Sequence, residues 1–341
     1  MYSFLNDYSE TAHPAVLQAL VDTNMEQCVG YGADEHCQQA IAYMKEKMNC
    51  QNVDIHFIPG GTHTNILAAA AFLRPIDAII TAETGHIHCH EAASIEAVGH
   101  KLLVEIAPDG KLTVDHLDHA WKLNQEEFCP TAKMVYISNT TEMGTAYNKA
   151  ELEALYAYCK SHNMILFIDG ARMGSALACT DLTFEDYPKL CDAFYVGGTK
   201  NGALMGEAMV IVNDSLKAGF RQHMKQRGAM LAKGKVLGVQ FETLFKENLF
   251  MELAQHANDC MDILRDGITE LGYKFLCDSP SNQIFPIFPL DILSKIGEKY
   301  VVMDYLDMPD GQRSVRMVTC WATEKEQCRN FVNDLKVWTK Q

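Results

Sequence analysis

The chain has 341 residues, of which 48% are hydrophobic, so it can bury the core of one large domain or of two domains. Its formal net charge is -15 at pH 7, and no block of Lys or Arg residues offers the basic face that a nucleic-acid partner requires. The polar start MYSFLNDYSE lacks an apolar signal region, and no apolar run reaches the roughly 18–20 residues of a membrane helix. The 12 cysteines include no C-x-x-C pair. We therefore expect a cytoplasmic protein with reduced, mostly buried thiols and no membrane partner.

The first 212 residues predict an α/β architecture. Residues 1–50 contain two helical patterns on either side of a turn with Gly30 and Gly32, and after them short β-branched runs alternate with helical patterns. The runs 133–138 and 164–168 are almost wholly apolar, as in parallel strands covered on both faces. This alternation predicts a parallel sheet with crossover helices. The expected helices are Pro14–Gln27, Glu35–Met48, Thr62–Leu73, His86–Val98, Val114–Leu123 and Lys149–His162, and the expected strands are Val53–Ile58, Ala78–Ala82, Leu102–Ile106, Lys133–Ser138, Met164–Ile168, Ala193–Val196 and Ala208–Val212.

The last third of the chain predicts a smaller α+β domain. Residues 214–267 are largely helical, and short strands and helices alternate again from Gly272 onward. No linker marks a boundary, so we divide the chain into an N-terminal segment at 1–50 that packs with both domains, a large domain at 51–245 and a small domain at 246–341. The expected strands are Tyr273–Leu276, Gln283–Pro286, Tyr300–Tyr305 and Ser314–Thr319, followed by a final helix from Thr323.

A glycine-rich motif, PGGTHTN, lies between a predicted strand and a predicted helix at Pro59–Asn65. Consecutive glycines let the backbone approach an anion closely, and the free N–H groups at the start of a helix favour a phosphate. The spacing matches neither the Walker loop nor the G-x-G-x-x-G dinucleotide motif. Taken alone, the motif is more often a turn with a capping threonine.

Two further motifs place a carboxylate and an amine after apolar strands. In MILFIDGAR the strand ends at Asp169, where an acid points into the crevice of an open α/β sheet, although an N-cap role is equally compatible with that position. In DAFYVGGTKNG, Lys200 follows a strand and is surrounded by small residues. Small neighbours leave room for a bulky cofactor on the lysine tip, as a Schiff-base lysine needs.

Together the three motifs predict a pyridoxal-phosphate enzyme. Asp169 can pair with the pyridinium nitrogen, Lys200 can form the imine, and the glycine-rich helix start can hold the phosphate. Their order along the chain resembles the aspartate-aminotransferase type of pyridoxal-phosphate-dependent transferase fold. That fold has a large, mostly parallel-sheet α/β domain and a smaller α+β domain.

Within that superfamily the chain most resembles the low-specificity L-threonine aldolases of the β-eliminating-lyase group. The resemblance covers most of the chain, and it implies retro-aldol cleavage of L-threonine, L-allo-threonine or related β-hydroxy-α-amino acids to glycine and an aldehyde. It also implies a homo-oligomer, dimer or tetramer, with shared active sites. The matching motifs are the opening FLNDYSETAHP, GYGADE at Gly30–Glu35, TGHI at Thr84–Ile87, DGAR at Asp169–Arg172, TK at Thr199–Lys200 and VRMVT at Val315–Thr319.

The resemblance implies a role for each matching residue near the cofactor. Lys200 would form the imine, Asp169 would keep the ring nitrogen protonated, and His86 would stack on the ring. His86 would also be the base for the β-hydroxyl proton, or would position a water that acts as one. The other implied cofactor contacts are Gly60, Gly61, Thr62 and Thr199.

The resemblance also implies the substrate contacts, with some departures. Arg172 and Arg316 would bind the substrate carboxylate, because an arginine fork donates two parallel hydrogen bonds to it, and Tyr31 would reach the site of a neighbouring subunit. Asn6 stands where many family members have serine, so substrate contacts can differ there. The family's basic phosphate contact could be Arg227 or Lys233 in QRGAMLAKGK, and the role of Glu91 is open.

The sequence is also compatible with three other functions: metal binding, a different pyridoxal-phosphate reaction, and regulation of transcription. The cluster GHIHCHE looks like a metal site, but Cys89 lies on a different helix face from His86 and His90, and the motif is not H-E-x-x-H, so we expect no metal. Another pyridoxal-phosphate reaction, such as β-elimination, transamination or serine hydroxymethyl transfer, would share Lys200 and Asp169. A cofactor-sensing regulator would append a DNA-binding module, and no basic N-terminal helix-turn-helix is evident. The preference between threo and allo substrates, and the direction of the reaction, stay open.

Overall fold

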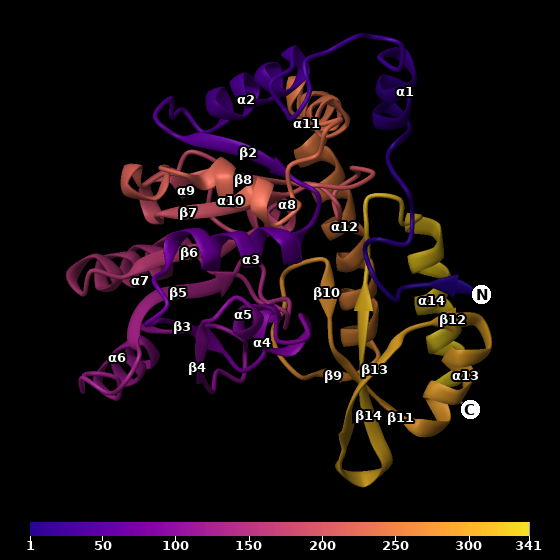
Figure 1. Ribbon diagram of the computed structural model, residues 1–341. Helices are drawn as coiled ribbons and strands as arrows, with labels where there is room; N and C mark the ends of the chain where they lie inside the picture. The colour runs from indigo at the N-terminus through magenta and orange to yellow at the C-terminus, as the bar shows by residue number, and fades with distance from the viewer. Residues whose placement is uncertain (341) are drawn as a thin grey trace.

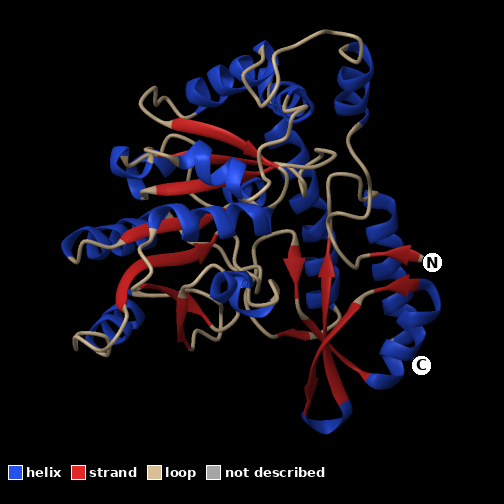
Figure 2. Ribbon diagram, in the orientation of Figure 1, coloured by secondary structure: helices blue, strands red, loops and turns tan. Residues whose placement is uncertain are grey.

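The computed structural model describes residues 1–340, which form a central seven-stranded sheet with helices on both faces (Figures 1 and 2). The strand order is β2-β8-β7-β6-β5-β3-β4, and β8 alone runs against its neighbours. The expectation of a mostly parallel sheet is therefore confirmed. The strands are β2 (Asp54–Ile58), β3 (Asp77–Ala82), β4 (Lys101–Glu105), β5 (Thr131–Ser138), β6 (Ile165–Asp169), β7 (Ala193–Gly197) and β8 (Glu207–Ile211).

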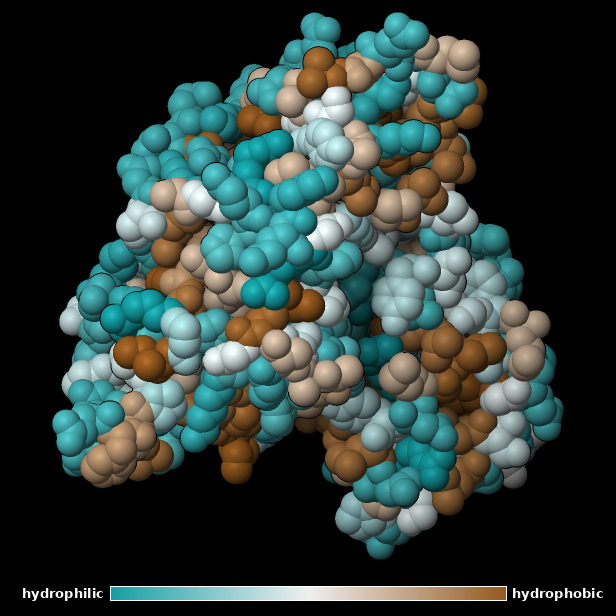
Figure 3. Space-filling view, viewed as in Figure 1, coloured by the Kyte–Doolittle hydropathy of each residue, from teal (hydrophilic) through white to brown (hydrophobic). Residues whose placement is uncertain are grey.

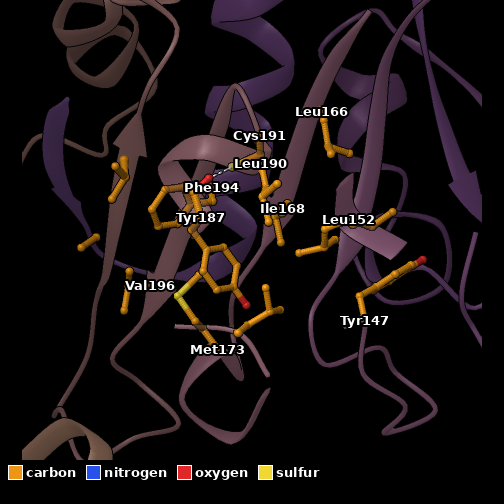
Figure 4. Packing of buried hydrophobic residues seen from close by; sticks show 14 of the residues in the cluster. Tyr147, Leu152, Leu166, Ile168, Met173, Tyr187, Leu190, Cys191, Phe194 and Val196 are labelled. Atoms are coloured by element: carbon orange, nitrogen blue, oxygen red, sulfur yellow. Dashed lines mark hydrogen bonds between the residues drawn. The ribbon is translucent and has the colours of Figure 1, made fainter. Parts of the chain in front are cut away.

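Both faces of the sheet are covered because successive side chains of each strand point to opposite sides. In β6, Ile165 and Phe167 join the core under α3 (Gly61–Phe72), α5 (Ser94–Ala97) and α10 (Phe220–Gln226). Leu166 and Ile168 join the opposite core, and Figure 4 shows them in the same cluster of buried side chains as Phe194 and Val196 of β7 and Tyr187 of α9 (Tyr187–Leu190). The helices of that second face include α6 (Val114–Lys122), α7 (Lys149–Ser161), α8 (Met173–Cys179), α11 (Lys235–Lys246) and α12 (Leu249–Glu270).

The C-terminal third builds a second sheet around a separate apolar core, shown in orange and yellow in Figure 1. Its strand order is β10-β14-β11-β9, with β13 also paired to β14, and α12 and two later helices cover it. None of the helices described, including the 22-residue α12, is long and apolar enough to cross a membrane. The elements are β9 (Lys274–Phe275), β10 (Gln283–Ile284), β11 (Pro286–Pro289), α13 (Leu290–Lys299), β12 (Tyr300–Val301), β13 (Met303–Met308), β14 (Gln312–Val318) and α14 (Lys325–Trp338).

The N-terminal segment contacts elements of both the large domain and the C-terminal region. Strand β1 (Tyr2–Ser3) pairs in parallel with β12, and the adjacent Phe4 is fully buried in the C-terminal core. Helices α1 (Pro14–Asp22) and α2 (Glu35–Lys47) pack instead against α11, at the top of Figure 1. The domain limits at residues 50 and 245 stay a prediction; the second falls within the last turn of α11.

Some predicted elements were wrong in extent. The helix expected at His86–Val98 is two short helices, α4 (His86–Cys89) and α5, because Ala92 and Ala93 adopt φ values of 50° and 59° in the left-handed region. This break lets the buried Glu91 side chain turn inward, where it bonds polar groups. The first helix ends at Asp22 rather than Gln27, and the strand expected at Tyr300–Tyr305 is divided between β12 and β13. The sequence analysis also missed β1, α8, α9, β11 and α13.

A histidine bridge between the N-terminal segment and α11 makes a pH-dependent contribution to stability. Nε2 of His36 lies 2.7 Å from Oε2 of Glu26, and its Nδ1 lies 2.7 Å from Oε2 of Glu242. Burial lowers the pKa of His36, but the hydrogen bonds to Glu26 and Glu242 outweigh it, so the net pKa is raised. The bridge is therefore fully present below the unfolded-state pKa of about 6.5 and is lost as pH rises through the higher folded-state value.

We expect the urea midpoint of the wild-type protein to exceed that of a His36→Gln variant at pH 6, and the gap to close by pH 9. Urea titrations followed by circular dichroism at several pH values measure this difference. A gap that widens with rising pH would contradict the assignment.

Candidate active site

A cavity of about 440 Å³ lies at the carboxyl ends of the parallel strands, where the space-filling view is hollowed between the large sheet and the C-terminal strands (Figure 3). Parallel strands bring the residues that follow them to one edge of a sheet, which is where ligands bind in open α/β folds. His86 follows β3, Glu142 follows β5 and Lys200 follows β7, while Arg316 comes from β14 of the second sheet. The edge of one sheet and a strand of the other thus enclose the cavity.

Asp169 ends β6 and is held by four donors. Its Oδ1 accepts from the Ala171 N–H at 2.9 Å and from the Tyr195 hydroxyl at 2.5 Å. Its Oδ2 accepts from the Tyr136 hydroxyl at 2.6 Å and from Nδ2 of Asn65 at 3.2 Å. Asp169 as a whole is 4% exposed, so these donors replace the water that burial removes from its carboxylate. The sequence analysis missed both tyrosines, because a tyrosine within an apolar strand cannot be told from an ordinary core residue by its sequence context.

His86 is oriented by Glu91. Nδ1 of His86 lies 2.8 Å from Oε1 of Glu91, which also accepts from Nδ2 of Asn65 at 2.8 Å. Burial lowers the pKa of His86, but the Glu91 hydrogen bond and the charges of Asp169, Glu91 and Glu142 outweigh it and raise the net pKa. The sequence left the role of Glu91 open. In the structure Glu91 fixes the orientation of the His86 imidazole ring. Asn65, at the end of the PGGTHTN motif, links this pair to Asp169.

Lys200 reaches the cavity as an amine without a carboxylate partner. Within residues 1–340 no acidic oxygen lies within 4.0 Å of its Nζ, which sits 6.0 Å from the centre of the Tyr8 ring. Burial and the nearby Arg172 charge lower the pKa of Lys200, which favours the neutral, nucleophilic amine. The adjacent Thr199 donates its hydroxyl to Oε1 of Glu207 at 2.8 Å, and burial raises the pKa of Glu207 to about 7.

The two arginines of the cavity differ in availability. Arg172 already donates from Nε and Nη2 to the carboxylate of Asp7, at 2.7 and 3.1 Å, and Asp7 also accepts from Nδ2 of Asn282. Arg316 makes one longer contact, from Nη2 to the Leu5 carbonyl at 3.3 Å, and among the described residues its buried Nε has no partner. Arg316 is therefore the better placed of the two to receive a carboxylate.

Two predicted substrate residues lie outside the cavity lining of this chain. The Asn6 side chain accepts from the Tyr8 N–H at 2.9 Å and from the Ser9 hydroxyl at 3.0 Å, which shapes the loop that carries Tyr8 into the cavity. Tyr31 is 46% exposed, and Nζ of Lys225 sits 4.6 Å from the centre of its ring.

The His86 and His90 rings of GHIHCHE lie near each other, as their i, i+4 spacing indicated. The His86 and His90 rings have centroids 5.6 Å apart, but His90 ends α4, and Sγ of Cys89 donates to the Glu83 carbonyl. Elsewhere in the described part of the chain, Glu26, Cys28 and His36 bring potential ligand atoms within 4.8 Å of one another. Both ring nitrogens of His36 are already engaged there by carboxylates.

The residues around the cavity fit the pyridoxal phosphate that the sequence predicts. Helix α3 starts at Gly61 with Gly60 as its N-cap, and none of the described side chains caps its N-terminal N–H groups, which can therefore receive an anion. This helix start adjoins Asp169, because a Cβ on Gly61 would lie 3.1 Å from the Tyr195 hydroxyl that donates to that carboxylate. The structure thus groups a helix start with free N–H groups, the buried carboxylate of Asp169, and Lys200, whose pKa is lowered.

Comparison with known proteins agrees with this grouping. A threonine aldolase structure from Leishmania major is 44% identical to the chain, covers 99% of it and all of that chain, and superposes with a TM-score of 0.98. A low-specificity L-threonine aldolase from Pseudomonas aeruginosa is 26% identical over 98% of this chain and 97% of its own length. A double mutant of Thermus thermophilus aspartate aminotransferase shares the fold. It is 15% identical to this chain and superposes with a TM-score of 0.72 over 99% of this chain and 91% of its own length.

These similarities confirm the fold class and the resemblance that the motifs indicated. The model of the beta-eliminating lyase family matches residues 4–286, which is most of the chain. That family and the fold neighbours imply pyridoxal phosphate as the cofactor. The chain is a member of the beta-eliminating lyase family.

Proposed function

We propose that this protein is a pyridoxal-phosphate-dependent carbon–carbon lyase that cleaves L-threonine or L-allo-threonine to glycine and acetaldehyde. The observation that carries the proposal is that Lys200, His86 and Arg316 line one cavity beside the buried Asp169. The names of the Leishmania major and Pseudomonas aeruginosa relatives support it. The substrate is then a small amino acid rather than a macromolecule.

The cofactor's contacts follow from the positions of the residues. Lys200 would bind the aldehyde carbon as an imine, and Asp169 would hold the proton of the ring nitrogen. The N-terminal N–H groups of α3, with Gly60, Gly61 and Thr62, would hold the phosphate. When bound, pyridoxal phosphate supplies an electron sink for the pair released as the Cα–Cβ bond breaks.

Arg227 is a better candidate than Lys233 for the basic phosphate contact. It ends α10, which packs against α3, and in the part of the chain described its buried Nε has no partner. Lys233 instead lines a different cavity, with Cys28 and Val29. Thr199 would act beside the cofactor through Glu207, to which its hydroxyl is bonded.

The substrate would be oriented through its carboxylate. Arg316 would donate to that carboxylate, and Arg172, held by Asp7, would complete the positive end of the cavity. With the carboxylate fixed, one bond at the α-carbon is aligned for cleavage and the others are not. His86 would stack on the cofactor ring, in an orientation set by Glu91.

We also propose that the protein assembles as a cytoplasmic homo-oligomer, dimer or tetramer. Three apolar side chains of the N-terminal segment, Val21, Met25 and Val29, are 67%, 86% and 68% exposed, which favours their burial by another subunit. Tyr31 lies on the same segment and would reach the neighbouring cavity, with Asn6 shaping the loop at that cavity's edge. The 12 cysteines are all free thiols, in keeping with a reducing compartment.

The proposal is tested by adding L-threonine to the purified enzyme, with alcohol dehydrogenase and NADH to detect acetaldehyde. We expect NADH consumption with the wild-type protein and none above background with Lys200→Ala, together with loss of the visible cofactor absorbance. Lys189→Ala, which changes an exposed lysine of α9, is the matched control and should behave as wild type. Pyruvate from serine, or dependence on a keto acid, would identify an elimination or a transamination instead. If the enzyme supplied with pyridoxal phosphate gave no acetaldehyde and no visible cofactor absorbance, the proposal would be refuted.

A further inference from the structure

Glu142 brings a carboxylate into the cavity from the loop that follows β5. Its Oε1 accepts from the His86 backbone N–H at 3.1 Å and from the Ser138 hydroxyl at 2.8 Å. Its Oε2 has no hydrogen-bond partner within residues 1–340, and this atom is not fully buried. One oxygen therefore anchors the side chain, while the other remains accessible in the cavity that Lys200 and Arg316 also line.

Most of the other carboxylates near the site have both oxygens bonded. Asp7 uses both oxygens for Arg172, Asp169 is held by four donors, and both oxygens of Glu91 are bonded, to His86, Asn65 and Ser94. Glu83 also lines the cavity and is likewise anchored through one oxygen, but that oxygen accepts from the Ala107 N–H, beyond the end of β4, and none of the hydrogen bonds described within residues 1–340 joins Glu83 to His86. Glu142 is thus the partly free carboxylate that is anchored to His86, in the cavity that Lys200 also lines.

His86 holds a proton more tightly than an ordinary histidine. Its Nδ1 is engaged by the fully buried carboxylate of Glu91, and Asp169 and Glu142 add negative charge nearby, which together raise the pKa of His86. The ring can accept a proton only in its neutral form, because an imidazolium has no free lone pair. Burial and the Asp169 charge raise the pKa of Glu142, which brings that carboxylate closer to the range of an effective base.

We propose that Glu142, and not His86, accepts the β-hydroxyl proton of the bound amino acid, an inference that rests on the proposed aldolase function. The O–H bond breaks and its proton passes to Oε2 of Glu142. The oxygen's electron pair forms the carbonyl of the aldehyde as the Cα–Cβ bond breaks, and the pair from that bond stays with the glycine fragment. One proton is then added at Cα, and Glu142 returns its own proton to solvent before the next turnover.

The test compares two reactions of the same holoenzyme. Glu142→Gln keeps an oxygen that can accept from Ser138 and from the His86 N–H, so the loop should stay in place. We expect its kcat for L-threonine cleavage to fall by about 10²–10⁴-fold. Exchange of the α-hydrogen of glycine with D₂O, followed by NMR, involves no β-hydroxyl and should stay within about threefold of wild type. The absorbance change on adding glycine should also be unaltered, and Glu96→Gln, at an exposed position of α5, serves as the matched control.

The pH dependence separates Glu142 from His86. The rise of kcat with pH on the acid side should disappear in Glu142→Gln and persist in His86→Phe, which keeps a ring for stacking. Threonine cleavage by Glu142→Gln within about threefold of wild type, or equal losses in cleavage and glycine exchange, would overturn the role of Glu142 as the base. A wild-type protein that exchanges the α-hydrogen of glycine but releases no aldehyde from any β-hydroxy amino acid would overturn the aldolase function itself.

Discussion

Replacing Asp169 with asparagine is expected to lower kcat/KM for threonine cleavage by about 10²–10³-fold, the usual effect of removing a preorganised electrostatic contact at a reaction centre. The single side-chain oxygen of asparagine can still accept from Tyr195 and from the Ala171 N–H, and its amide group can donate to the Tyr136 hydroxyl oxygen, so the fold around β6 should remain. It carries no charge to keep the ring nitrogen of the cofactor protonated, and the electron sink is weakened. The coupled NADH assay measures the loss.

A milder variant shows whether the charge or the hydrogen-bond network is responsible. Tyr136→Phe removes one neutral donor to Asp169 and leaves the carboxylate in place. We expect a loss of about tenfold or less, since one such bond is worth roughly 1 kcal/mol. Comparable losses in Tyr136→Phe and Asp169→Asn would assign the effect to the network. Wild-type turnover in Asp169→Asn would remove Asp169 from the cofactor site.

Replacing Asp7 with alanine is expected to lower the free energy of unfolding by about 3–5 kcal/mol, because it leaves the Arg172 charge buried without its partner. The Asp7 and Arg172 side chains are 1% and 10% exposed, and two hydrogen bonds join them. Urea unfolding followed by circular dichroism measures the change. A loss below about 1 kcal/mol would show that solvent or another acid compensates Arg172.

The double variant and the pH dependence test the same pair independently. Asp7→Ala with Arg172→Met should be more stable than Asp7→Ala alone, because no uncompensated charge remains. Burial raises the pKa of Asp7, but the charges of Arg172 and Lys200 outweigh it, so the net pKa is lowered. The contribution of the pair is therefore present above the unfolded-state pKa of about 3.9 and is lost as pH falls through the lower folded-state value. The advantage of the wild type over Asp7→Ala should shrink in that acidic range.

Local patterns were sufficient for most of the large sheet. The apolar runs of β5 and β6 are buried on both sides, apart from Thr131 and Lys133 at the start of β5, and short runs of this kind are typical of strands covered on both faces. The helix expected at His86–Val98 failed because its apolar spacing carries no information about the left-handed backbone of Ala92 and Ala93, a break that lets Glu91 turn inward. In β11, proline at both ends hid a strand that is recognisable only by its pairing with β14 and β9.

The sequence by itself determined the groups that stand directly at strand ends, Lys200, Asp169 and the glycine-rich start of α3, because strand–loop–helix junctions are local and their chemistry follows from adjacent residues. Only the tertiary structure decided how those groups are supported. Asp7 occupies the fork of Arg172 from 165 positions away, Asn65 links Glu91 to Asp169, and Glu142 meets His86 across 56 positions. These contacts depend on how distant segments pack, which no local spacing encodes, and they set which arginine and which carboxylate remain free in the cavity.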